Sequence, residues 1–224
     1  MPTAIEIFKH LPKKNCGECR YPTCLAFAMQ LANGKAKLDD CPHLSEEGRS
    51  ALASSSAPPI RSVKVGVGKG AVEMGGETEL YRHDKRFFHP TAFALRVTDE
   101  GSEEKVDGRL AYARSLRFER VGQEMGLDLL ELEYRSGDPG RFIGLVRKVA
   151  DGTDLPLVLR CHDPAVMAAA VAEVRERRPL LHGADAVNLE QMAEVAKTAG
   201  CPLVLCADDL GRLADLVGMA RKKG

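Results

Sequence analysis

The stretch "LPLVLRCHDPAVMAAAVAEVRERR" (residues 155–178) decides the fold class of this chain. It begins with an apolar run that ends at Arg160, and after Asp163 and Pro164 it continues as a segment rich in alanine and valine. A continuous apolar run is typical of a parallel strand that is buried on both faces under helices. An aspartate followed by proline indicates a helix start, because the carboxylate caps the first turn and proline needs no amide partner there. The stretch therefore predicts one βα unit.

The same pattern recurs on both sides of this unit. Strand-like and helix-like segments alternate in pairs: "TAFALRVTD" with "SEEKVDGRLAYARSLRF", "LDLLELEYR" with "DPGRFIGLVRKVADG", "PLLHGAD" with "NLEQMAEVAKTAG", and "CPLVLCADD" with "LGRLADLVGMARKKG". Capping side chains are expected at the helix starts, at Ser102, Asp138, Asp163 and Asn188. Together the segments make five βα units in series.

Serial βα units build either a TIM barrel or a doubly wound parallel sheet. A complete barrel takes ~250 residues and eight units, whereas residues 91–224 hold five. We therefore expect an α/β fold with a partial TIM barrel of about five βα units, and the doubly wound parallel sheet is the alternative.

Residues 60–90 differ in composition from the units that follow them. Valines alternate in "SVKVGVG" (residues 62–68) and glycines are frequent, which predicts short strands joined by tight turns. The glycines do not spell the G-x-G-x-x-G pattern of a dinucleotide site, so we interpret them as turn residues. The segment "YRHDKRFFHP" (residues 81–90) suits either an interface or bound anion, or an ordinary solvated strand end. The segment gathers His83, Asp84, Lys85, Arg86 and His89.

Four cysteines lie in "NCGECRYPTCLAFAMQLANGKAKLDDCP" (residues 15–42), with the spacing C-x2-C-x4-C-x16-C. They are Cys16, Cys19, Cys24 and Cys41. Structural zinc usually takes two closely spaced ligand pairs, and the second pair is absent here. Three close ligands followed by a distant fourth are more typical of a 4Fe-4S cluster, so the spacing favours a cluster, with zinc as the alternative. Four thiolates would occupy every iron, which favours electron transfer over chemistry at an open iron.

The third cysteine is expected at the start of a helix. The segment "CLAFAMQLANG" follows Thr23, a good N-cap, and ends at Gly34, a typical helix stop. The free N–H groups and the positive dipole end of such a helix suit sulfur ligands that carry negative charge. The stretch therefore predicts a small helical domain that holds a metal centre.

The chain divides into three segments. Residues 1–53 form the expected cluster domain, "SSSAPP" (residues 54–59) has the composition of an exposed linker, and residues 60–224 hold the short strands and the partial barrel. The 32 Lys and Arg residues balance the 32 Asp and Glu residues, so no net field recruits nucleic acid or an anionic membrane. The N-terminus lacks the apolar region of a signal peptide, and no run of about 18 apolar residues occurs. We therefore expect a cytoplasmic protein with reduced thiols.

The remaining candidates lie near the ends of expected strands. Cys161 and Cys206 follow apolar runs and Cys201 precedes one, and such cysteines are usually small buried hydrophobes. His162 lies at the same edge, together with three aspartates that we interpret as helix caps: Asp163, Asp208 and Asp209. No arrangement of nucleophile, base and acid is apparent, so no catalytic residue is assigned.

The segment "LPKKNCGECRYPTCLAFAMQLANGKAKLDDCP" (residues 11–42) resembles the N-terminal cluster domain of the large (gamma) subunit of the corrinoid iron-sulfur proteins, also called the gamma subunit of the acetyl-CoA decarbonylase/synthase complex. Segments such as "MGGETELYRHDKRFFHPTAFALRVTD" and "RRPLLHGADAVNLEQMAEVAK" are similar to the first part of that family's TIM barrel. The resemblance covers essentially the whole chain. It implies that Cys16, Cys19, Cys24 and Cys41 are the four ligands of a 4Fe-4S cluster.

The resemblance also implies a methyl carrier of the reductive acetyl-CoA (Wood–Ljungdahl) pathway. In the family, a cobalamin-type corrinoid accepts a methyl group from methyltetrahydrofolate or a related methyl-pterin through a methyltransferase, and passes it to acetyl-CoA synthase/CO dehydrogenase. The cluster restores Co(I) when the cobalt has been oxidised to Co(II). The implied partners are the methyltransferase, acetyl-CoA synthase/CO dehydrogenase and the small (delta/beta) subunit.

The C-terminal corrinoid domain of the family has no counterpart in this sequence, so we expect the corrinoid to bind outside this chain. Two other functions stay open from the residues alone. One is a stand-alone 4Fe-4S electron-transfer module without a corrinoid, and the other is a zinc-stabilised interaction module.

Overall fold

The computed structural model describes residues 3–33, 35–56, 60–77, 83 and 87–223. The chain forms two compact units. The first comprises Met1–Arg61 and Gly75–Phe88, and the second comprises Ser62–Met74 and His89–Gly224. The cysteine-rich stretch belongs to the first unit and the βα units belong to the second.

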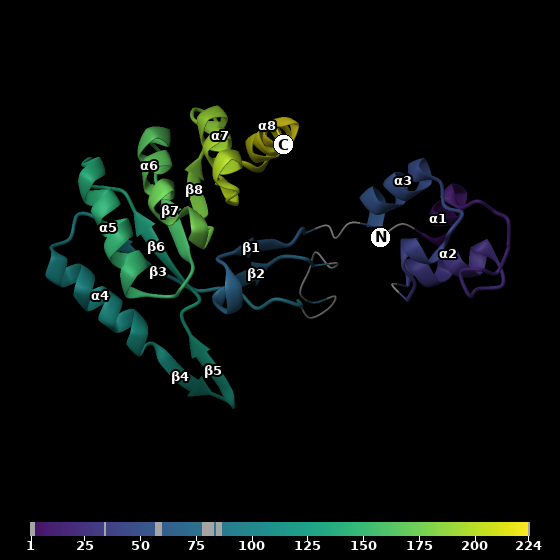
Figure 1. Ribbon diagram of the computed structural model, residues 1–224, viewed down its shortest axis with the longest axis horizontal. Helices are drawn as coiled ribbons and strands as arrows, with labels where there is room; N and C mark the ends of the chain where they lie inside the picture. The colour runs from purple at the N-terminus through teal and green to yellow at the C-terminus, as the bar shows by residue number, and fades with distance from the viewer. Residues whose placement is uncertain (1–2, 34, 57–59, 78–82, 84–86, 224) are drawn as a thin grey trace. The chain divides into compact units, whose positions relative to one another are not determined.

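Short helices build the first unit. They are α1 (Ala4–His10), α2 (Cys24–Ala32), the 3-10 helix η1 (Leu38–Asp40) and α3 (Glu46–Ser56) (Figure 1). A capping box starts α1, because the Thr3 hydroxyl accepts the Glu6 N–H and the Glu6 carboxylate accepts the Thr3 N–H. Ile7, Phe27 and Leu52 come one from each α-helix and are buried in a common core. Three of the four cysteines belong to the same core.

The described α-helices are between 7 and 14 residues long. Within the described part of the chain, each helix is too short or too polar to cross a membrane. Helix α3 runs through Ser56, so it includes the first residues of the expected linker 54–59, and residues 57–59 lie outside the described part.

Five parallel strands form the sheet of the second unit. They are β3 (Ala94–Thr98), β6 (Leu129–Glu133), β7 (Leu157–Arg160), β8 (Leu180–Ala184) and β9 (Leu203–Leu205). Their order across the sheet is the same as their order along the chain. A doubly wound sheet instead reverses its order at a switch point. The sequential order is that of a TIM barrel, so the partial barrel is confirmed and the doubly wound alternative is wrong.

Helices cover one face of this sheet. They are α4 (Glu103–Ser115), α5 (Pro139–Gly152), α6 (Pro164–Val174), α7 (Leu189–Ala199) and α8 (Leu210–Lys223), with the 3-10 helix η3 (Arg175–Arg177) after α6. Right-handed crossovers between neighbouring parallel strands place every helix on the same side, and Figure 1 shows α5, α6 and α7 side by side there. The strands contribute Leu132, Leu159 and Leu181 to the main core, and the helices contribute Phe142 and Met167. All five side chains are fully buried. The main core therefore lies between the sheet and a single helical layer.

The second face of the sheet departs from the expected burial under helices. Near the strand starts, Leu129 and Val158 pack with Val65 of an antiparallel hairpin made of β1 (Val63–Val65) and β2 (Val72–Met74). Farther along, this face carries a network of ion pairs, formed by Arg96, Glu131, Glu133 and Arg160. Arg96 Nε donates to Glu131 Oε2 at 2.7 Å. Glu131 and Glu133 alternate with leucines along β6, and Arg96 of β3 and Arg160 of β7 pair with them. An apolar hairpin and ion pairs therefore cover this face instead of helices.

The first βα unit also contains a hairpin that was not predicted. The expected helix through Phe118 ends at Ser115, and β4 (Arg117–Arg120) pairs with β5 (Gln123–Gly126) in antiparallel fashion. Val121 and Gly122 both have positive φ, 52° and 71°, the pattern of a type I′ turn. Valine seldom takes this conformation, so the sequence carried little signal for the turn.

Two of the four expected helix caps are confirmed. The side chains of Asp138 and Asp163 each accept two N–H groups from the first turn of their helices. Ser102 and Asn188 occupy N-cap positions, but neither side chain bonds to its own helix.

The described residues between 60 and 90 form turns and short strands as expected, including the 3-10 helix η2 (Gly68–Gly70). Gly66 and Gly75 have φ values of 84° and 79°, which confirms the turn interpretation. A Cβ at Gly75 would stand 2.2 Å from the Arg61 carbonyl oxygen. Asp84, Lys85 and Arg86 of the predicted charged segment lie outside the described residues.

Candidate metal centre

The four cysteines converge from three segments of the first unit. Cys16 and Cys19 lie on the loop after α1, Cys24 is the first residue of α2, and Cys41 follows η1. Cys19, Cys24 and Cys41 are buried, whereas Cys16 is exposed. Burial raises the pKa of the Cys41 thiol, a backbone hydrogen bond at His43 opposes this shift, and charge on the other three sulfurs adds to it. The four sulfurs therefore interact electrostatically, and a bound cation would favour their thiolate forms.

The loop that carries the first two cysteines has an unusual backbone. Gly17 has a φ of 76°, and Lys13, Asn15 and Arg20 also have positive φ values of 56°, 49° and 70°. The Arg20 N–H closes a turn on the Gly17 carbonyl at 3.0 Å. This conformation costs an ordinary residue about 1–2 kcal/mol, and such strain tends to persist at functional sites. The concentration of positive φ values around the cysteines makes this loop a candidate functional site.

Helix α2 presents its N-terminus at Cys24. Thr23 caps the helix, because its hydroxyl accepts a backbone N–H of the first turn at 3.1 Å. The Cys24 N–H donates to Asn15 Oδ1 at 2.8 Å, and the Asn15 N–H donates to Cys24 Sγ at 3.4 Å. A thiolate at Cys24 lies at the positive end of the helix dipole. The helix ends at Ala32, and the expected stop at Gly34 lies outside the described residues.

The segment that carries Cys41 is joined to the first cysteine loop. His43 Nε2 and Glu18 Oε1 lie 3.1 Å apart, and Glu18 stands between Cys16 and Cys19. The contact spans 25 residues of chain, so the spacing of the cysteines gave no sign of it. Asn15, Glu18 and His43 are therefore the site residues that sequence reasoning missed.

The separation of the sulfurs bears on the centre that they fit. The ligand atoms of Cys16, Glu18 and His43 lie within 4.8 Å of one another, and no other trio of His, Cys, Asp or Glu in the described residues does so. No three of the four sulfurs are therefore that close together. Sulfur ligands of one tetrahedral zinc, at Zn–S of ~2.3 Å, stand about 3.8 Å apart. In every trio of the four sulfurs, at least one pair is therefore farther apart than two ligands of one zinc ion would be.

Three exposed cations lie close to the first two cysteines along the chain. Lys13, Lys14 and Arg20 are exposed, as Cys16 is. Lys13 Nζ lies 5.6 Å from the centre of the Phe8 ring, a cation–π contact that keeps its charge beside the loop. The site therefore has an accessible edge at Cys16, where the Glu18 carboxylate lies within 4.8 Å of the sulfur and three exposed cations are close along the chain.

The cysteines of the second unit do not form a comparable centre. Burial raises the pKa of the Cys161 thiol to about 11 and also raises that of Cys201. Both thiols are buried, which confirms them as small core residues. Cys206 is partly exposed, and its Sγ lies 3.9 Å from His182 Nε2.

Polar residues at the strand ends serve mainly to hold the loops. Asp163 and Asp209 accept N–H groups at the starts of α6 and α8, as expected. Asp208 instead forms an ion pair with Arg212 at 3.7 Å, so its assignment as a cap is wrong. His162 is exposed, with its Nδ1 3.7 Å from Asp185 Oδ2.

Two buried polar residues at these strand ends were not recognised in the sequence as loop anchors. Asp99 accepts the N–H groups of Arg135 and Ser136, each at 2.8 Å, and the Ser136 hydroxyl at 2.6 Å. Asn188 donates to carbonyl groups after β7 and within β8, at 2.8 and 3.0 Å. These bonds cross from one loop to another, so a local pattern does not reveal them.

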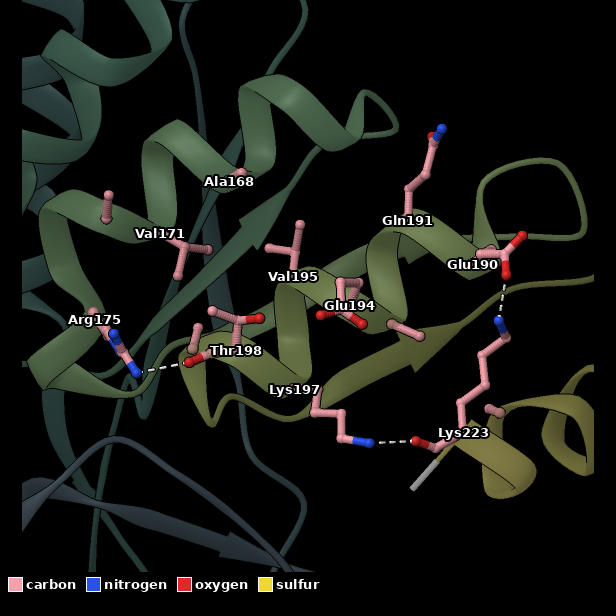
Figure 2. A pocket seen from close by; sticks show the side chains of 14 residues that line it. Ala168, Val171, Arg175, Glu190, Gln191, Glu194, Val195, Lys197, Thr198 and Lys223 are labelled. Carbon is pink, nitrogen blue, oxygen red and sulfur yellow. Dashed lines mark hydrogen bonds and ion pairs between the residues drawn. The ribbon is translucent and has the colours of Figure 1, made fainter.

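A groove of about 910 Å³ lies on the outside of the helical layer, between α6, α7 and the end of α8 (Figure 2). The cations along it are already bonded: Arg175 donates to the Thr198 carbonyl at 2.6 Å, Lys197 to the Lys223 carbonyl at 2.7 Å, and Lys223 pairs with Glu190. None of the four clustered cysteines lines it. We therefore assign the metal centre, not this groove, as the candidate functional site.

Two family models match this chain. The model described as "Putative Fe-S cluster" matches residues 11–43, and the model described as "CO dehydrogenase/acetyl-CoA synthase delta subunit" matches residues 62–224. These two matches fall on the cysteine-rich stretch and on the partial barrel.

Individual relatives match nearly the whole chain. The chain is 49% identical to the corrinoid/iron-sulfur protein large subunit of Moorella thermoacetica, over 96% of this chain and 48% of that protein. It is 34% identical to the acetyl-CoA decarbonylase/synthase complex subunit gamma of Methanothermobacter thermautotrophicus, over 98% of this chain and 47% of that protein. The chain thus spans about half the length of these curated relatives. Among solved structures, dihydropteroate synthase of Xanthomonas albilineans aligns at 22% identity with a TM-score of 0.42, over 59% of this chain and 56% of that chain.

Proposed function

This chain belongs to the CO dehydrogenase/acetyl-CoA synthase delta subunit family, and we propose that it is an electron carrier whose 4Fe-4S cluster is held by Cys16, Cys19, Cys24 and Cys41. The observation that carries the proposal is the convergence of these four thiols in one small unit. The match of residues 11–43 to an iron-sulfur family model supports it.

The proposed electron acceptor is the cobalt of a corrinoid bound outside this chain. When bound, the cluster supplies one electron at a time, which converts inactive Co(II) to the methyl-accepting Co(I) state. The printed names of the relatives, a corrinoid/iron-sulfur protein and a subunit of acetyl-CoA decarbonylase/synthase, support this acceptor. The chain would then serve methyl transfer from methyltetrahydrofolate or another methyl-pterin to acetyl-CoA synthase in the reductive acetyl-CoA (Wood–Ljungdahl) pathway.

The residues of the first unit suit this role in three ways. The buried cysteines lie among apolar side chains such as Phe27 and Ala28, which exclude water from the sulfurs. The N-terminus of α2 stabilises negative charge on Cys24. The exposed Cys16 gives an electron donor access to the site, and the exposed Lys13 and Arg20, which are close to it along the chain, favour a donor with acidic side chains.

The proposed partners follow from the same family. They are the small (delta/beta) subunit, the methyltetrahydrofolate methyltransferase and acetyl-CoA synthase/CO dehydrogenase, and the proposed location is the cytoplasm. We also propose that residues 1–53 act as the cluster domain and that residues 54–59 link it to the barrel region 60–224.

Anaerobic purification followed by metal and sulfide analysis tests the cluster. We expect about four irons and four sulfides per chain, and an electron paramagnetic signal after reduction. Cys24→Ser and Cys41→Ser should lose most of the iron, whereas Cys206→Ser, a change to a partly exposed cysteine of the second unit, should keep it. Stoichiometric zinc without sulfide would contradict the proposal and support the zinc-stabilised interaction module.

A separate experiment tests the acceptor. The iron-loaded, reduced chain is mixed with a Co(II) corrinoid protein, and formation of Co(I) is followed by its absorbance. We expect Co(I) to form with the loaded parent and not with iron-free Cys41→Ser. A loaded chain that reduces a generic one-electron acceptor but never Co(II) would favour the stand-alone electron-transfer module.

A further inference from the structure

The residue before the first cysteine makes two hydrogen bonds with the third cysteine. The Asn15 N–H donates to Cys24 Sγ at 3.4 Å, and Asn15 Oδ1 accepts the Cys24 N–H at 2.8 Å. Both contacts join residues nine positions apart and are partly buried. Asn15 therefore fixes the start of α2 against the loop that continues directly into Cys16.

The conformation of Asn15 explains why this position suits asparagine. Its φ of 49° is left-handed, a conformation that asparagine tolerates better than other residues with a Cβ. The side chain must also accept a hydrogen bond, because the Cys24 N–H lies in the first turn of α2 and has no partner within the helix. Glycine would satisfy the first requirement but not the second, and alanine would satisfy neither.

The backbone bond has an electrostatic consequence at the sulfur. An N–H donor beside a thiolate favours the state in which the sulfur carries more negative charge. In an iron-sulfur cluster that state is the reduced one, so each N–H···S bond raises the reduction potential. Because φ sets the direction of a residue's own N–H, a change in the φ of Asn15 would turn this donor relative to Cys24 Sγ.

We propose that Asn15 is a positioning residue of the metal centre, which orients Cys24 through its side chain and tunes the cluster's reduction potential through its backbone N–H. This inference rests on the proposed iron-sulfur function. Substitutions can separate the two roles of Asn15. The side-chain bond needs an acceptor oxygen at residue 15, whereas the backbone bond needs the left-handed conformation.

Three variants of the full chain, each purified anaerobically, test the proposal. Asn15→Gly keeps the backbone conformation and loses the side-chain acceptor, so the potential should stay near that of the parent while a chelator removes iron about fivefold faster. Asn15→Ala disfavours the left-handed conformation, so the potential should fall and iron loss should also be faster. Asn15→Asp keeps the acceptor but adds a negative charge, so the potential should fall with little change in iron loss.

Asn33→Asp is the matched control. Asn33 is exposed at the other end of α2, roughly 13 Å along the axis from Cys24 at 1.5 Å per residue, so the same added charge should shift the potential much less. Parent-like potentials and chelator rates in all three Asn15 variants would overturn the inference. A parent chain that holds no iron and sulfide would instead overturn the proposed function, so the two failures are distinguishable.

Discussion

Replacing Asp99 by alanine should loosen the C-terminal edge of the sheet in the second unit. Asp99 follows β3, is 4% exposed, and accepts hydrogen bonds from Arg135 and Ser136 of the β6–α5 loop. Because β3 and β6 are neighbours in the sheet, the carboxylate joins the ends of two strands through one side chain. Alanine would leave the N–H groups of Arg135 and Ser136 without their acceptor.

The contacts set the size of the effect. A buried donor left without a partner costs about 1–3 kcal/mol, and these two donors are partly buried, so we take the lower half of that range for each. The lost bonds together should lower the free energy of unfolding by about 3 kcal/mol. In a unit of this size, 1 kcal/mol corresponds to about 2–4 °C, so the melting temperature of the second unit should fall by about 6–12 °C.

Thermal unfolding followed by circular dichroism measures this change, and hydrogen exchange at residues 135 and 136 localises it. Asp128→Ala is the matched control, because it removes one exposed bond to the Phe93 N–H at 2.8 Å and should cost less than about 1 kcal/mol. Asp99→Asn retains an acceptor oxygen and should fall between the two. Equal melting temperatures for Asp99→Ala and Asp128→Ala, with unchanged exchange at the loop, would refute the reasoning.

Three further predictions concern the second unit. Phe142→Ala should lower the free energy of unfolding by about 3–5 kcal/mol, because this ring is fully buried. The Phe118 ring is 52% exposed, so Phe118→Ala should lower it by less than about 1 kcal/mol. Urea titration of both variants measures the difference. Burial raises the pKa of the Cys161 thiol from 9.0 to about 11, so the folded state keeps this proton longer than the unfolded chain. The contribution of this thiol to stability should therefore be constant below about pH 9 and fall by about 2–3 kcal/mol toward pH 11. A Cys161→Ala chain with the same alkaline loss would contradict this. Gly183→Ala should destabilise the β8 bulge, because the φ of Gly183 is 122° and a Cβ there would meet the Cys161 carbonyl oxygen at 2.5 Å. A Cβ at Gly108 in α4 would meet nothing within 4 Å, so Gly108→Ala should stabilise that helix slightly. The melting temperature should therefore fall for the first variant and rise for the second.

Local patterns predicted the βα units well but misjudged what surrounds them. The apolar run in β7 correctly indicated a buried strand, since Leu157 and Leu159 are fully buried. Charges at every second position, such as Glu131 and Glu133 in "LELEY", do indicate a polar second face, but the apolar runs of the neighbouring strands carry the stronger signal. The β4–β5 hairpin was missed because its turn uses Val121, a residue that seldom signals a turn.

At the metal centre, the sequence identified the cysteines but not the residues that orient them. The spacing C-x2-C-x4-C-x16-C is itself a local pattern, so it was visible without a structure. The bonds from Asn15 to Cys24 and from Glu18 to His43 span 9 and 25 residues. These separations along the chain do not match the spacing of neighbours on a helix or a strand. Only the folded loop brings the residues of each pair together.

The amino-acid sequence by itself determined the kinds of element, the number of βα units and the set of four thiols, because periodicity, helix starts and ligand spacing are properties of short stretches. The tertiary structure alone decided the order of the strands and the separation of the sulfurs. Similar βα units can wind in one direction or in two, and the choice depends on which strand edges pair at long range. The cysteines also depend on long-range packing. Their spacing along the chain limits the possible metal centres, but the packing of α2 and η1 around them sets the distances between the sulfurs.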